Sequence, residues 1–136
     1  MTESLPDIKT ICFERNLAHP PSKVWRALTV PAFLEEWLMK ANFRLQHGHR
    51  FNFQADWGHV DCEILEFETE RRLSYTWGDG TLETVVTWTL TPAKNGTLLT
   101  MEQSGFKKDQ PRYYGGALQG WPRFFDQLET ALARGD

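Results

Sequence analysis

The stretch LSYTWGDGTLETVVTWTL, residues 73–90, alternates apolar and mostly hydroxyl-bearing side chains on both sides of a Gly-Asp-Gly turn. One apolar row precedes the turn and a second follows it: Leu73, Tyr75 and Trp77, then Val86, Trp88 and Leu90. A period of two is typical of strands with one buried and one solvated face. The stretch therefore predicts a β-hairpin within an antiparallel sheet.

The same alternation continues on both sides of this hairpin. Apolar rows recur in residues 51–55 and 60–64, and the strand predicted over residues 97–104 turns Gln103 inward beside Leu99 and Met101. Gly-containing turns separate most of these segments, and an earlier strand is predicted over residues 8–18. We expect an antiparallel meander.

Helical spacing appears on each side of the meander. Prolines open two short predicted helices, at Pro21 with Ser22 as a candidate cap and at Pro31, and we expect Trp25 and Trp37 to pack in the core. After a polar loop over residues 105–111, a long helix is predicted over residues 112–134. Its apolar stripe comprises Tyr114, Leu118, Trp121, Phe125, Leu128 and Leu132. Pro122 predicts a kink, or a helix that becomes regular only there.

Length and charge narrow the class of protein. The 136 residues suit one domain over residues 1–136, and a net charge of −3 offers no basic face for nucleic acid or an anionic membrane. No apolar run has the length of a signal peptide or a membrane span, so we expect a cytoplasmic protein. In that compartment Cys12 and Cys62 are expected to be buried, reduced thiols.

The order of elements resembles the helix-grip fold of the START-like, or SRPBCC, superfamily. Local motifs resemble the family related to the C-terminal domain of the heat-shock-protein-ninety ATPase activator; they lie in residues 18–29, 48–53, 63–77, 86–92, 96–97, 104–106 and 120–132. The resemblance implies an α+β fold, in which a curved antiparallel sheet wraps around the long C-terminal helix, with two short helices after the first strand. It also implies a role in the stress response. Family members often carry His at the position of Gln103 and a Gly-Gly pair where this chain has His47-Gly48-His49.

The residues offer little acid–base chemistry. Asp56, Asp61, Glu63 and Glu102 fall on the solvated rows, and no histidine shares a strand face with Cys62. His47 and His49 could face one side of an extended segment, but two ligands do not make a metal site. No Gly-rich phosphate loop follows a strand. We therefore predict no catalytic residue, no metal and no cofactor.

The leading hypothesis is a carrier or sensor that binds a small hydrophobic or aromatic molecule between the sheet and the C-terminal helix. The candidate ligand-binding residues are Phe53, Trp57, Cys62, Tyr75, Trp77, Trp88, Met101, Gln103, Tyr114, Leu118 and Trp121. The tryptophans either fill this space or line a cavity, and both readings stay open.

Two alternative functions and a further partner are also consistent with the sequence. One is a cyclase- or hydrolase-type enzyme that uses Tyr114 or Gln103 to polarise a carbonyl. The other, suggested by the resemblance alone, is a module that regulates a chaperone ATPase and has a chaperone as its partner. The sequence also allows a homodimer through an edge strand or the short helices, without indicating a residue for it.

Overall fold

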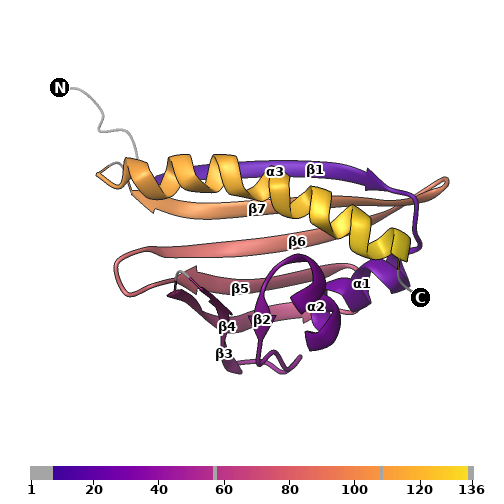
Figure 1. Cartoon of the computed structure of the whole chain (residues 1–136), viewed down its shortest axis with the longest axis horizontal. Coiled ribbons are helices and arrows are strands. Elements are labelled where there is room, and N and C mark those ends of the chain that lie inside the picture. Colours follow the sequence, from indigo (N-terminus) through magenta and orange to yellow (C-terminus); the bar gives the residue numbers. More distant parts are fainter. Residues whose placement is uncertain (1–7, 57, 108, 135–136) are drawn as a thin grey trace.

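The computed structural model of the protein describes residues 8–56, 58–107 and 109–134. These residues form a curved seven-stranded antiparallel sheet and three α-helices (Figure 1). The elements in chain order are β1 (Ile8–Leu17), α1 (Pro21–Thr29), α2 (Pro31–Trp37), β2 (Lys40–Ala41), β3 (Arg50–Ala55), β4 (Gly58–Glu68), β5 (Arg72–Gly78), β6 (Glu83–Ala93), β7 (Gly96–Lys107) and α3 (Pro111–Arg134).

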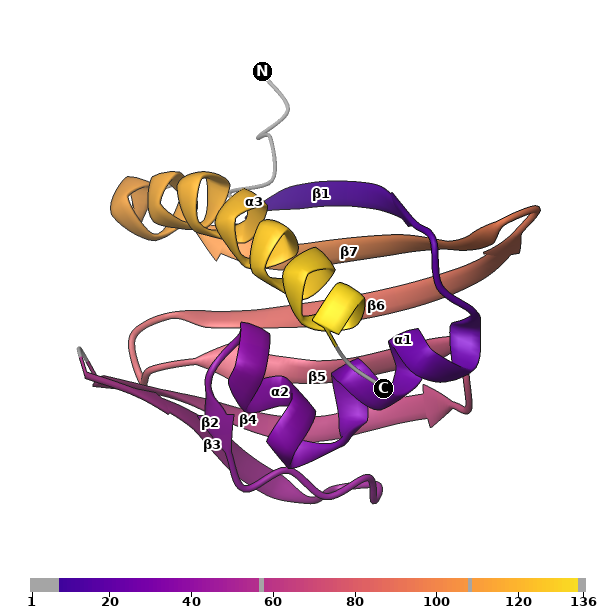
Figure 2. The same ribbon diagram turned by 45° about the vertical axis from the view of Figure 1, so that its right-hand side comes forward.

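All three helices lie against one face of the sheet (Figures 1 and 2). The strand order is β1-β7-β6-β5-β4-β3-β2, so β1 crosses over to pair with the last strand while the others form a meander. The long helix α3 lies along β1 and β7, and α1 and α2 cover the rest of the same face (Figure 2). This arrangement confirms the predicted α+β helix-grip fold.

The hairpin predicted from residues 73–90 is present in the expected register. Tyr75 pairs with Val86 and Leu73 with Trp88, across a turn that follows Gly78. The predicted inward side chains of both strands are buried, and Trp88 is fully enclosed. Parity along these strands was therefore a sound guide to the concave face.

A β-bulge at Gly105 changes the parity of the last strand. Lys9 pairs with Phe106, but the next residue, Thr10, pairs with Ser104, so Gly105 is an extra residue. Its φ is +110°, and a Cβ there would lie 2.9 Å from the carbonyl oxygen of Glu83, which requires glycine. The bulge turns Phe106 into the core. The predicted polar loop over residues 105–111 is thus wrong in its first part, because β7 continues to Lys107.

The two short helices begin at prolines, as the sequence indicates. The helix α1 has Pro20 as its N-cap with no side-chain hydrogen bond, so the prediction that Ser22 caps it is wrong. Trp25 and Trp37 are buried, which confirms their packing role. The Trp37 Nε1 donates to the carbonyl oxygen of Ala27 at 2.8 Å and thereby joins α2 to α1.

The helix α3 runs unbroken from Pro111 to Arg134, so the alternative of a regular helix only from Pro122 is wrong. Its buried residues are Trp121, Phe125, Leu128, Ala131 and Leu132. The prediction that Leu118 faces the sheet is also wrong, because this side chain is 41% exposed. None of the helices among the described residues is long and apolar enough to cross a membrane.

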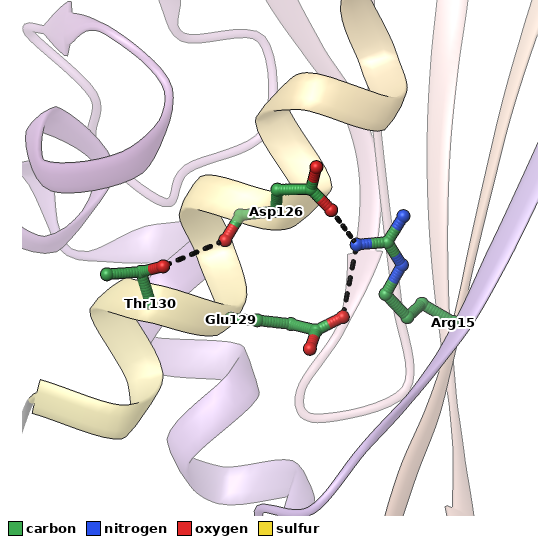
Figure 3. Close-up of polar contacts among 4 residues, drawn as sticks. All are labelled: Arg15, Asp126, Glu129 and Thr130. Carbon is green, nitrogen blue, oxygen red and sulfur yellow. Dashed lines mark hydrogen bonds and ion pairs between the residues drawn. The ribbon is translucent and has the colours of Figure 1, made fainter.

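Arg15 on β1 anchors the C-terminal half of α3 to the sheet (Figure 3). Its Nη1 donates to Asp126 Oδ1 at 2.6 Å and to Glu129 Oε2 at 3.1 Å. The guanidinium carbon also lies 5.3 Å from the ring centroid of Phe125. Because the arginine side chain is 28% exposed, these interactions are less screened than those of a fully solvated ion pair.

Replacement of Arg15 by alanine tests this anchor. We expect Arg15→Ala to lower the free energy of unfolding by about 1–2 kcal/mol, since it removes two ion pairs and a cation–π contact. Urea denaturation followed by tryptophan fluorescence measures the change. Arg50→Ala is the matched control, because its 84%-exposed side chain forms an ion pair with Glu63, and we expect a loss below about 0.5 kcal/mol. Equal losses in both variants would contradict the anchoring role.

Candidate functional site

A crevice of about 240 Å³ lies between the N-terminal half of α3 and the sheet. Both the sheet with its β5–β6 turn and the helix α3 contribute residues to the lining. The sheet side consists of Val60, Trp77, Leu82, Gln103 and Phe106, and the helix side consists of Arg112, Tyr113, Gly116, Ala117, Gly120, Trp121 and Phe124.

Small residues on α3 leave the space that forms the crevice. Gly116 and Gly120 lie one helical turn apart on the face toward the sheet, with Ala117 between them. A Cβ built at either glycine would meet no atom within 4 Å, so each position borders open space. Glycine lowers helix stability by about 1 kcal/mol relative to alanine. At this end the helix is therefore less stable, and the space between it and the sheet is not filled by side chains.

Aromatic rings close the inner end of the crevice. The Trp121 ring from α3 lies 5.2 Å from the Trp77 ring of β5 and 5.7 Å from the Trp88 ring of β6, centroid to centroid. Phe124 contacts the other side of Trp121 at 5.6 Å. Such tilted and edge-to-face pairs are the geometries that aromatic quadrupoles favour. The inner wall is therefore flat-sided and apolar.

A chain of buried hydrogen bonds joins α3 to the sheet beside these rings. The Trp121 Nε1 donates to Gln103 Oε1 at 2.7 Å, and Gln103 Nε2 donates to Thr84 Oγ1 at 2.9 Å. The Thr84 hydroxyl in turn donates to the carbonyl oxygen of Trp77 at 2.7 Å. Gln103 is 1% exposed, so both ends of its amide are satisfied inside the protein.

Polar contacts close the rim between α3 and the β5–β6 turn. Asp79 Oδ1 accepts from the backbone N–H groups of Thr81 and Leu82, and its Oδ2 accepts from the Tyr113 hydroxyl at 2.9 Å. The Leu82 N–H, the nearest of these donors, contributes most to holding the pKa of Asp79 below its ordinary value. Gln110 Nε2 also donates to the Thr81 carbonyl oxygen.

The structure separates the predicted ligand-binding residues into groups. Trp77, Gln103 and Trp121 line the crevice. The deeper candidates are enclosed in the packed core behind it, namely Phe53, Cys62, Tyr75, Trp88 and Met101. The two readings of the tryptophans thus each apply to part of the fold, since rings fill the middle of the grip and line the crevice at one end.

The remaining candidates lie away from the crevice or outside the described residues. Tyr114 is half-buried. The centroid of its ring lies 5.6 Å from that of Phe106 and 5.0 Å from the Lys9 Nζ. Leu118 is exposed to solvent, whereas the predicted stripe is correct from Trp121 onward, at Trp121, Phe125, Leu128 and Leu132. Trp57 lies outside the described residues.

Burial keeps the inward titratable groups neutral at physiological pH. Desolvation raises the pKa of the Cys62 thiol well above its usual range, and the Asp61 charge adds to this effect. The Tyr75 hydroxyl is fully buried and accepts from Trp88 Nε1 at 2.9 Å; burial raises its pKa as well. Cys12 is exposed on the outer row of β1, so the prediction that it is buried is wrong.

The two histidines considered as metal ligands stack on rings instead. His47 lies 4.4 Å from the Phe67 ring, and His49 lies 6.1 Å from the Phe51 ring with its Nε2 3.1 Å from the Asn42 carbonyl oxygen. No cluster of three or more His, Cys, Asp or Glu side chains suited to a metal occurs in the part of the chain that the structure describes.

Two surface grooves are larger than the crevice but differ in lining. One of about 740 Å³ follows residues 68–72 and 89–92, and the other, of about 610 Å³, borders β5, β6 and the turn between them and shares Trp77 and Leu82 with the crevice. Charged residues, threonines and glycines make up most of both linings. The aromatic and apolar character expected of a small-molecule site is instead concentrated under α3.

Sequence reasoning missed several lining residues. Phe106 was assigned to a loop because the bulge at Gly105 is invisible to a period-two pattern, although a glycine next to a large aromatic residue could have signalled it. Tyr113, Gly120 and Phe124 were missed because each lies beside a residue of the predicted apolar stripe and not on it. Leu82 follows the turn and lay outside the predicted strands.

Comparison with known proteins identifies relatives over nearly the whole chain. The model of the family described as Activator of Hsp90 ATPase homolog 1-like protein matches residues 18–133. No curated protein matches the chain significantly.

Several solved structures share the architecture. The crystal structure of protein MLL2253 from Mesorhizobium loti is 55% identical, with a TM-score of 0.89 over 94% of this chain and 99% of that one. CalU16 from Micromonospora echinospora is 25% identical, with a TM-score of 0.78 over 93% and 78% of the two chains. Protein NE0264 from Nitrosomonas europaea is 24% identical, with a TM-score of 0.80 over 92% and 94%, and supports the fold alone.

The hydrogen bond between Trp121 and Gln103 is testable by a double-mutant cycle. Gln103→Leu leaves the indole N–H without an acceptor in the core, and we expect a loss of about 1–3 kcal/mol in unfolding free energy. Trp121→Phe removes the donor, so the double variant should lose less than the sum of the single losses, by about 1 kcal/mol. Urea denaturation measures all four proteins. Strictly additive losses would argue against this bond as the link between helix and sheet.

The rim contact at Asp79 predicts a pH-dependent stability. The pKa of Asp79 is lower in the folded protein than the ordinary value of about 4, so its ionised form favours folding. Its contribution is present above about pH 4 and is lost as the pH falls through the lowered pKa. We therefore expect the native protein to be more stable than Asp79→Asn at pH 7, with the difference shrinking at low pH. Thermal unfolding across this pH range checks it, and a constant difference would refute it.

Proposed function

The chain belongs to the family of Activator of Hsp90 ATPase homolog 1-like proteins, and from this premise we propose that it binds a small apolar or aromatic molecule in the crevice under α3, as a carrier or sensor. Family membership and the shared fold do not specify a ligand, because one fold hosts many functions. The observation that carries the proposal is the lining itself. Aromatic rings form the floor, and Gly116 and Gly120 leave part of the helix side without side chains.

The size of the crevice limits the ligand. A dry cavity of roughly 150 Å³ accommodates benzene, and drug-sized ligands occupy pockets of roughly 300–1,000 Å³. The volume of about 240 Å³ lies between these values. It therefore suits a molecule of one or two rings, and it is too small for a large multi-ring compound without movement of α3.

The character of the walls supports a planar ligand. The Trp77 and Trp121 rings are tilted by 50° to each other and are 9% and 3% exposed, so the part of each ring that borders the crevice offers a small apolar floor to a flat molecule. Val60, Leu82 and Phe106 surround them with apolar surface. Burial of apolar area supplies roughly 25 cal/mol per Å², so contact with these walls alone gives useful affinity to a small arene.

The chemistry of the inward polar groups favours binding over catalysis. The Gln103 amide is satisfied by Trp121 and Thr84, and is therefore a poor candidate for polarising a substrate carbonyl. Cys62 and Tyr75 are held neutral and lie behind the rings. The interaction-module alternative calls for an apolar docking patch. Among the described residues, the exposed large apolar side chains Val30, Leu65 and Leu118 lie at separate places in the fold.

Filling the crevice from the helix side tests the proposal. We expect the neutral probe naphthamide to shift the amide NMR signals of Gly116 and Gly120 and the indole signals of Trp77 and Trp121. In Gly120→Leu the new side chain occupies the open space that borders this position, so affinity for naphthamide should fall by at least about ten-fold.

Gly115→Leu is the matched control for this experiment. Gly115 is also a helical glycine with no atom within 4 Å of a built Cβ, but it does not line the crevice. Both variants gain helix propensity and should be as stable as the native protein or more stable by up to about 1 kcal/mol. Only Gly120→Leu should lose binding. No response to naphthamide or to other neutral arenes of one or two rings would refute the proposed function.

A further inference from the structure

Among the described residues that line the crevice, Arg112 is the one that carries a charge. It lies in the first turn of α3, whereas the remaining lining consists of apolar, aromatic or glycine residues, the Tyr113 phenol and the amide of Gln103. The chain as a whole carries a net charge of −3. The charge at this position is therefore opposite in sign to the net charge of the protein.

The guanidinium of Arg112 is uncommitted. No carboxylate lies within ion-pair distance of it among residues 8–56, 58–107 and 109–134, although these residues form several other ion pairs. The carboxylate at the nearby rim, Asp79, is already occupied by the N–H groups of Thr81 and Leu82 and by the Tyr113 hydroxyl. Arg112 is thus free to meet an anionic group of a ligand.

Most other side-chain donors of the crevice are engaged within the protein. The Trp121 indole N–H donates to Gln103 at 2.7 Å, Gln103 Nε2 donates to Thr84 at 2.9 Å, and the Tyr113 hydroxyl donates to Asp79. The Trp77 indole N–H has no hydrogen bond within the described residues, but it is a single neutral donor. An anionic group on a bound molecule would therefore find its charged donor in Arg112, whose planar fork matches the two oxygens of a carboxylate.

We propose that the ligand class of this crevice is an aromatic carboxylate of one or two rings, with the ring against Trp77 and Trp121 and the carboxylate at Arg112. The inference rests on the proposed function, because it assigns the polar end of a molecule whose apolar end occupies the same crevice. The guanidinium orients the ligand and selects an anion over its neutral analogue. Because Arg112 is exposed, its contribution is screened by salt.

The test compares naphthoate with naphthamide, which have the same rings and nearly the same shape but differ in charge. We expect naphthoate to bind the native protein about five-fold more tightly at low ionic strength, as measured by the same NMR titration. The preference should disappear in Arg112→Gln and persist in part in Arg112→Lys. It should also decline as salt is raised, since screening shortens the range of the interaction from about 30 Å to about 3 Å between 0.01 and 1 M.

Arg123→Gln is the matched control, because it removes the same charge from the same helix at an exposed position outside the crevice. It should keep the full preference for naphthoate. Equal affinities of the two probes for the native protein, or a preference unchanged in Arg112→Gln, would overturn the inference and leave the proposed function standing. Failure of both probes to bind would overturn both.

Discussion

The hydrogen bond from Trp121 Nε1 to Gln103 Oε1 determines how the long helix lies on the sheet. Both groups are buried, and an indole N–H or an amide left unpaired there would cost about 1–3 kcal/mol, so few other placements of α3 are accessible. The bond fixes the rotation of the helix about its axis and its height above β7. Since the Trp121 ring also packs on Trp77 and Trp88, this residue joins the middle of the helix to the sheet by both polar and apolar contacts.

The two halves of α3, on either side of Trp121, are held to the sheet in different ways. Toward the C-terminus, apolar side chains enter the core and Arg15 holds the outer face of α3, so that half is closely packed. Toward the N-terminus, Gly116 and Gly120 offer no side chains, and the rim is held by polar contacts to the β5–β6 turn. The crevice therefore forms where α3 carries small residues on the side that faces the sheet.

The fold could be predicted from the sequence largely because its information is local. Alternation of apolar and hydroxyl residues identified the inward faces of β5 and β6, and proline positions located both short helices. The site was less predictable because it depends on non-local geometry. Gly105 reverses the parity of β7 and brings Phe106 inward, which a period-two pattern does not reveal. The inward face of α3 was predicted correctly from Trp121 onward, but Leu118 in the glycine-rich first half is exposed, because few bulky apolar residues mark the inward face there.

Stability and binding are thus assigned to different ends of one element. The C-terminal half of α3 supplies the packing that offsets the weak helix propensity of the glycines, so Gly116 and Gly120 can change with little effect on the fold. Gln103 and Trp121, in contrast, both line the crevice and attach the helix to the sheet. The ligand that this crevice accepts therefore depends on a few side chains such as Arg112 and on the volume left by Gly116 and Gly120.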